Sequence, residues 1–91
     1  MASTFDELVT MQRAADRAHG RVEELRDAYG PPTGTPWTPL QTDAYDTAWR
    51  EWRDLAQTVQ AAITAYAKDQ GAARSQTEAD VKAAARHAEE G

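Results

Sequence analysis

Apolar residues recur at alternating steps of three and four along two stretches of this chain, and this spacing constrains the fold more than any other feature. The more apolar stretch lies in the middle of the chain, at Tyr45, Ala48, Trp52, Leu55, Val59, Ala62 and Tyr66. Such steps place side chains on one face of a helix, and Trp49, Ala56 and Ile63 widen that face. A helix with this aromatic load needs other elements to cover it, so we expect a packed helical domain.

A matching stretch lies near the start of the chain, at Leu8, Met11, Ala15, Ala18, Val22, Leu25 and Tyr29. Thr4 and Glu7 have the spacing of a capping box at its beginning. Gly30 is suited to end a helix, and Pro31 and Pro32 cannot continue one. These signals predict a helix over about residues 4–28.

The second helix has equally clear boundaries. Thr38 and Gln41 have the spacing of a capping box, and Pro39 occupies the favoured first helical position. Gly71 follows the last apolar residues as a stop signal. The sequence therefore predicts a helix over about residues 39–70.

The two apolar stretches have the same length, because positions 8–29 and 45–66 each span twenty-two residues. The connection between them is rich in Pro and stiff, and it is long enough to let the helices fold back on each other. We expect an antiparallel hairpin, with Tyr29 beside Tyr45 and Leu8 near Tyr66.

A weaker pattern follows the hairpin. Ser75 with Glu78, or Thr77 with Asp80, offers a start signal, and the apolar content is Val81 with several alanines. This narrow apolar face predicts a helix of about 76–88 that packs only loosely. The predicted fold class is all-α: an antiparallel helical hairpin (about 4–28 and 39–70) with a Pro-rich turn and a short C-terminal helix (about 76–88), in one domain over 1–91.

Charge and composition exclude several functions. The 91 residues carry a net charge of −5, and no segment is basic, which makes nucleic acid an unlikely partner and argues against adsorption to anionic membranes. The absence of Cys excludes disulfides and thiolate chemistry. The first residues contain no continuous apolar run, so we expect a cytoplasmic protein, with export by a signal-less route left open.

Catalytic motifs are missing as well. The two His, at 19 and 87, have no triad or metal-binding spacing around them, and no glycine-rich phosphate loop is present. His19 is expected to be a surface residue that pairs with Glu23. The carboxylates of Glu23 and Asp27 lie off the apolar face and are interpreted as a solvated surface. We therefore expect no enzymatic activity, no cofactor and no bound metal.

Aromatic residues concentrate at the turn end of the predicted hairpin. One interpretation is a small hydrophobic core, with Trp52 on the helix seam and Trp37 folded over it. The other is a protein-binding surface, because Trp, Tyr and Arg dominate the energetics of interfaces. One short helix cannot easily cover three Trp, so we favour a non-enzymatic interaction module that binds a protein partner or a second copy of itself. The predicted binding residues are Trp37, Tyr45, Trp49, Arg50, Trp52 and Arg53.

A DNA-binding alternative rests on the last part of the chain. Residues 60–88 have the order of a helix, a short polar turn and a helix. In a helix-turn-helix protein the second of these would contact DNA through its first residues, here Gln76 and Thr77. Most apolar positions expected of that helix are absent, since Thr77 and Asp80 fall where aliphatic residues should be.

A second alternative comes from the hairpin itself. The hairpin at residues 5–70 is short and acidic, contains no Cys, and has a Trp at the turn between its helices. In these features the chain resembles the WXG family of type VII secretion substrates. At the turn it reads Trp37-Thr38-Pro39, with Pro where the family has Gly, and Tyr66 is followed four residues later by Gln70 instead of an acid. The resemblance implies an exported hairpin that dimerises tightly through its seams.

Overall fold

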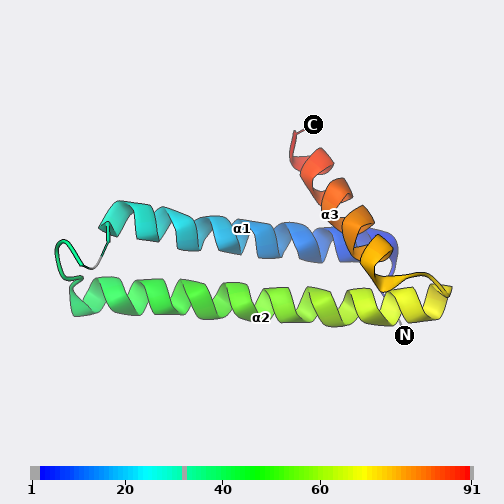
Figure 1. Cartoon of the computed structure of the whole chain (residues 1–91), viewed down its shortest axis with the longest axis horizontal. Helices are drawn as coiled ribbons and strands as arrows, with labels where there is room; N and C mark the ends of the chain where they lie inside the picture. Colours follow the sequence, from blue (N-terminus) through cyan, green and yellow to red (C-terminus); the bar gives the residue numbers. More distant parts are fainter. Residues whose placement is uncertain (1–2, 32, 91) are drawn as a thin grey trace.

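The computed structural model describes residues 3–31 and 33–90 and shows an all-α arrangement of three helices over these ranges (Figure 1). Helix α1 (Phe5–Tyr29) and helix α2 (Pro39–Gln70) lie side by side and antiparallel, while α3 (Arg74–Glu90) crosses them at the end away from the turn. The molecule is elongated, with extents of 51 × 27 × 18 Å. The predicted fold class is confirmed, as are the bounds of the first two helices to within a residue.

Side-chain caps begin both hairpin helices as predicted. The Thr4 hydroxyl accepts from the Glu7 amide at 3.2 Å, and the Glu7 carboxylate accepts from the Thr4 amide at 3.1 Å. Thr38 and Gln41 make the same reciprocal pair at 3.1 and 2.9 Å. Each box satisfies amide groups that a helix start leaves without a partner, and so defines where the helix begins.

Glycines end the same two helices. Gly30 has φ 74° and its amide donates to the Arg26 carbonyl at 3.0 Å. Gly71 has φ 64° and ψ 30°, the left-handed conformation that glycine adopts without steric cost. Pro31 follows the first of these stops, and Pro32 lies outside the described residues.

The third helix begins earlier than predicted. It starts at Arg74, so Ser75 and Thr77 lie inside it and neither acts as its cap. The Thr77 hydroxyl donates back to the carbonyl of Ala73 at 3.1 Å, an interaction that a Thr makes within a helix. The capping pattern was misleading here because Thr77 is buried against the hairpin, with only 5% of its surface exposed.

The core consists of two clusters along the hairpin. The cluster at the end away from the turn contains Leu8, Ala15, Val59, Ile63 and Val81, with Phe5 and Tyr66 packed against it. The cluster nearer the turn contains Val22, Leu25 and Ala48, with Tyr29, Tyr45 and Trp52 around it. Tyr29 and Tyr45 therefore belong to one cluster, and Leu8 and Tyr66 belong to the other, which agrees with the pairing that the matched stretches predicted.

Helix α3 packs more closely than its narrow apolar face suggested. Val81 and Ala85 are completely buried, because they fill the angle between α1 and α2 at the end away from the turn. Arg74 also ties the start of α3 to α2: its Nε donates to the Thr64 hydroxyl at 2.9 Å, and its guanidinium contacts Gln60. Small side chains let α3 approach the hairpin closely, which compensates for their small apolar area.

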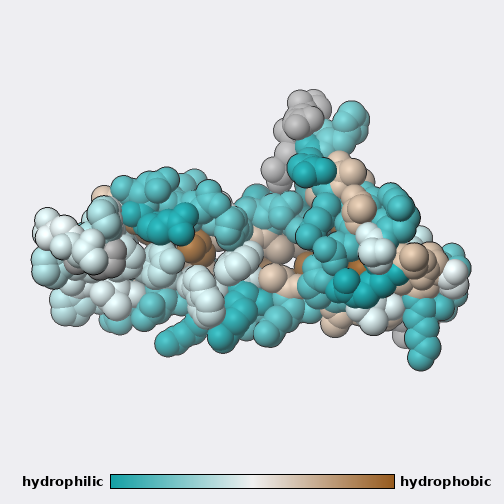
Figure 2. Space-filling model, in the orientation of Figure 1, coloured by the Kyte–Doolittle hydropathy of each residue, from teal (hydrophilic) through white to brown (hydrophobic). Residues whose placement is uncertain are grey.

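Polar residues cover most of the face shown in Figure 2, and apolar residues come to the surface between the helices and around α3. Among the described residues, no helix combines the length and the apolar character needed to cross a membrane.

Ile63 should be a major contributor to stability, because its side chain is completely buried in the cluster that joins all three helices. We expect Ile63→Ala to lower the free energy of unfolding by about 2–4 kcal/mol, from lost burial and the cavity that remains. The matched control is Gln57→Ala on the exposed side of α2. This substitution should change the free energy of unfolding by less than about 0.5 kcal/mol. Urea unfolding followed by circular dichroism measures both, and equal losses would contradict the assignment of the core.

The start of α3 should respond to acid through Glu78. Lys82 Nζ donates to Glu78 at 3.0 Å and Arg74 Nη1 donates to it at 2.9 Å. The Lys82 hydrogen bond is the largest cause that lowers the pKa of Glu78 below its ordinary value. A lowered pKa in the folded state stabilises the fold above the unfolded-state pKa, and this stability is lost as the pH falls through the folded-state pKa.

We therefore expect Glu78→Gln to lower the free energy of unfolding at pH 7 by about 0.5–1 kcal/mol, the range for partly exposed ion pairs. Between pH 7 and about pH 3 the difference between wild type and variant should shrink, because the carboxylate gains protons as the pH falls toward its lowered folded-state pKa. The control is Asp46→Asn, an exposed carboxylate on α2. Urea unfolding at the two pH values provides the test, and a difference that persists in acid would argue against this role for the ion pairs.

Candidate functional site

The aromatic residues at the turn end of the hairpin separate into two groups. The first, the turn cluster, consists of Tyr29 at the end of α1, Trp37 in the connection and Tyr45 on α2. The second, the Trp49–Trp52 surface, consists of Trp49, Trp52 and Arg53 on α2 with His19 on α1. Five of the six predicted binding residues therefore fall into these two groups, although Tyr45 and Trp52 both pack against the core cluster near the turn.

The turn cluster closes the hairpin. The ring centroid of Trp37 lies 5.5 Å from that of Tyr29 and 5.1 Å from that of Tyr45, both in edge-to-face geometry. Its indole N–H donates to the Gly30 carbonyl at 2.8 Å, which satisfies a polar group at the end of α1. Trp37 therefore packs between the two tyrosines, and the expected contact with Trp52 is replaced by these interactions.

The Trp49–Trp52 surface is more open. Trp52 is half-buried, with its ring centroid 4.8 Å from the imidazole of His19. Trp49 packs edge-to-face on Trp52 at 6.3 Å, and the Arg53 guanidinium lies 5.0 Å from the Trp49 ring centroid. Trp49 remains 38% exposed, in spite of these neighbours. A large apolar ring is thus held in a defined orientation with one side in water.

His19 has both an expected and an unexpected neighbour. Its Nδ1 lies 3.0 Å from a carboxylate oxygen of Glu23, which confirms the predicted surface pair. Its contact with Trp52 was not predicted, although His19 follows Ala15 by four residues and so lies close to the seam of α1. The spacing could have indicated that this side chain reaches α2.

Trp52 also forms part of the wall of an open groove between the three helices, with a volume of about 550 Å³. Asp16 on α1 and Lys82 and Arg86 on α3 line it, so the groove presents both signs of charge. Gln12 is 7% exposed at its base and donates to Asp16 at 2.8 Å. No sequence pattern predicts this combination, because docking of α3 brings together residues that are about seventy positions apart.

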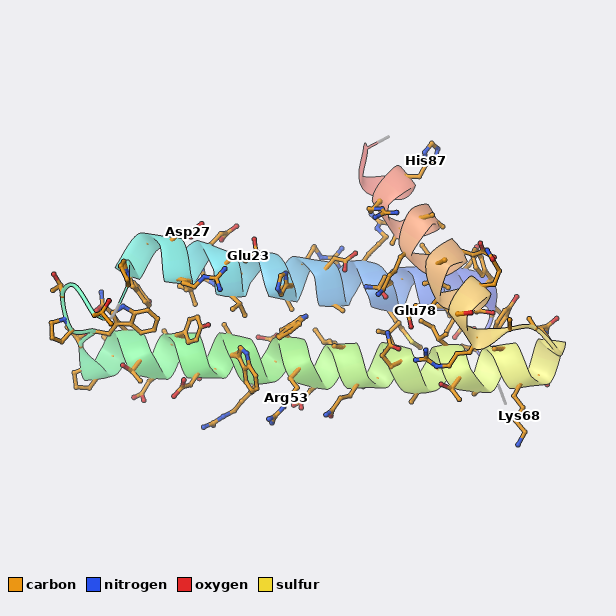
Figure 3. The ribbon with its side chains drawn as sticks, in the orientation of Figure 1. Glu23, Asp27, Arg53, Lys68, Glu78 and His87 are labelled. Atoms are coloured by element: carbon orange, nitrogen blue, oxygen red, sulfur yellow. The ribbon has the colours of Figure 1, made fainter. Side chains whose placement is uncertain are left out.

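The remaining predicted residues lie elsewhere. Arg50 is exposed and sits two positions before Trp52, about 160° around the helix, so it faces away from the hairpin seam. Figure 3 shows Arg53 on the outer side of α2, and Glu23 and Asp27 on the side of α1 turned away from α2. Within the described residues, no group of three or more His, Asp or Glu side chains is placed to hold a metal ion.

The two residues expected to read DNA are not presented together. Thr77 is buried and bonded to the Ala73 carbonyl, so its side chain is unavailable to a duplex. Gln76 is exposed, and its amide donates to Asp80 at 2.8 Å. In α3 the surface that would face DNA is therefore used in part to pack on the hairpin.

Comparisons of the chain with models of protein families, with curated proteins and with solved structures find no match. The resemblance to WXG proteins therefore rests on the shape of the hairpin and the Trp at its turn.

Substitutions should separate a structural Trp from an exposed one. We expect Trp37→Phe to lower the free energy of unfolding by about 1 kcal/mol, because it keeps a ring between the tyrosines and removes the hydrogen bond to Gly30. Trp37→Ala should cost about 2–4 kcal/mol, and Trp49→Ala less than about 1 kcal/mol. Urea unfolding at one protein concentration measures all three, and a loss at Trp49 as large as that at Trp37 would contradict this division.

Proposed function

We propose that the protein is a small, non-enzymatic interaction module that binds another protein through the Trp49–Trp52 surface. The observation that carries the proposal is Trp49, which is 38% exposed while Trp52 and Arg53 hold its ring in place. An exposed indole on a rigid helix loses little conformational freedom on binding, which is the property of an interface hot spot.

The groove beside Trp52 supports the same function. Hot-spot side chains are most effective when they adjoin a cavity that a partner can fill, and the groove continues this surface from α2 toward α3. Its charged residues can orient a partner, since Asp16 lines it from α1 while Lys82 and Arg86 line it from α3.

The polar groups of the site support binding more than catalysis. His19 is paired with Glu23, Asp16 accepts from Gln12, and Lys82 donates to Glu78. None of these three interactions joins a nucleophile to a general base, which is the arrangement that covalent catalysis requires.

The WXG-like alternative is supported by a different observation, the Trp37 ring that closes the turn of a two-helix hairpin. Under that alternative the protein is a secreted hairpin and accumulates outside the cell that makes it. Under the interaction-module proposal the Trp49–Trp52 surface binds its partner wherever the protein is located.

Removal of the Trp49 ring should abolish partner binding while the fold is retained. In a pull-down from cells of the source organism, we expect a protein captured by the wild type to be lost with Trp49→Ala. It should be kept with Gln57→Ala, an exposed substitution on another side of α2. The purified partner should then bind Trp49→Ala at least about 30-fold more weakly, which corresponds to about 2 kcal/mol for a hot-spot residue. Equal capture by all three proteins would refute the proposal.

A further inference from the structure

Leu40 is the most exposed large apolar side chain among the described residues, with 81% of its surface in contact with solvent. It is the second residue of α2 and precedes Trp49 by nine positions. Nine residues turn a helix by about two and a half turns, so Leu40 and Trp49 point in opposite directions from α2. Leu40 therefore belongs to a different surface from the one proposed above.

A shallow depression of about 460 Å³ surrounds Leu40 and spans both hairpin helices. Leu25, Ala44 and Ala48 form its apolar part, and Arg21, Asp43 and Glu51 stand at its sides. Leu25 and Ala48 also belong to the core cluster near the turn, so the depression is an opening toward that core. Because it is open to solvent, an apolar side chain of another molecule can contact it.

This surface extends along both helices beside the buried seam, and four of its residues, Met11, Leu25, Leu55 and Ala62, are themselves packed in or against the core. On α1 it comprises Met11, Ala14, Ala18, Arg21, Leu25 and Ala28, and on α2 Leu40, Ala44, Thr47, Glu51, Leu55, Thr58 and Ala62. The spacing is again by threes and fours, which places each set on one flank of its helix. We name these residues the open face.

Helix α3 covers the other side of the hairpin. Its first residue, Arg74, bonds to Thr64 and contacts Gln60 on α2. Gln60 follows Leu40 by twenty positions, which corresponds to about 200° around α2 and so to the opposite flank. The open face is thus left uncovered by the third helix.

The open face carries one charged residue on each helix: Arg21 on α1 and Glu51 on α2. Both line the depression at Leu40, and they come from its two walls. Arg21 makes only a weak contact with Glu24 on its own helix, at 3.8 Å with both side chains more than half exposed. A surface with opposite charges on its two halves is complementary to a second copy of itself that is related to it by a two-fold axis.

We propose that a second copy of the chain packs on the open face, with α1 of each protomer over α2 of its partner. The two-fold axis then runs along the hairpin, and the two turns lie at the same end. In this arrangement Arg21 faces Glu51 of the partner subunit, and the pair occurs twice. Leu40 of each copy enters the apolar depression of the other.

Charge selects this arrangement over the other way of stacking two hairpins. A two-fold axis across the hairpin would bring α1 against α1 and α2 against α2, which separates the opposite charges. A stable interface needs about 800 Å² from each partner, and the hairpin runs along the 51 Å axis of the molecule, which gives room for it (Figure 1). The many alanines of the open face allow the helices of the two copies to approach closely.

The test is the mass in solution, measured by light scattering over a concentration series. The wild-type chain of 10.0 kDa should give twice that mass at high concentration. Arg21→Glu and Glu51→Arg should each weaken dimerisation by about tenfold or more, because each puts two like-charge contacts into the interface. The double variant Arg21→Glu/Glu51→Arg should restore the dimer, since it exchanges the charges on both sides.

Matched controls are Arg26→Glu and Asp46→Arg, which make the same charge changes at exposed positions and should leave the dimer intact. Each lies five positions, about 140° around its helix, from the open-face residue that it matches. Circular dichroism confirms that every variant is folded. A wild-type monomer at all concentrations, or single variants that dimerise like the wild type, would overturn the proposal. Trp49→Ala should remain dimeric, so loss of partner binding and loss of the dimer are separate results.

Discussion

Two packed helices can bury only one stripe of each, and this limit governs the rest of the structure. The hairpin buries the seams that contain Leu8, Val22, Val59 and Ile63, yet both helices carry apolar residues on their flanks as well. Helix α3 covers one flank at the end away from the turn, where Val81 enters the core. The surfaces that remain are the Trp49–Trp52 surface on the same flank and the open face on the other.

The three Trp residues show how position on this frame decides what a side chain does. Trp37 comes from the connection and fills the space between Tyr29 and Tyr45, so its ring holds the turn together. Trp52 lies on the seam and covers part of the core. Trp49 lies one position beyond the seam and packs on Trp52, so that part of its ring remains exposed.

Much of the candidate site could be predicted, and the rest depended on contacts between helices. The sequence identified the aromatic residues and the pairing of His19 with Glu23. It could not show that Trp37 and Trp52 belong to separate groups, because the path of the connection decides where Trp37 lies. It also could not place Lys82 and Arg86 beside Trp52, since their neighbours depend on the angle at which α3 crosses the hairpin.

The sequence alone determined the two long helices, their capping boxes at Thr4 and Thr38, and their glycine stops. These depend on interactions within a few residues, which propensity and spacing encode directly. Only the tertiary structure decided the start of α3, where packing of Thr77 against the hairpin replaced the expected cap. It also decided which flank α3 covers, because that choice depends on how residues about seventy positions apart, such as Leu8 and Val81, share one core.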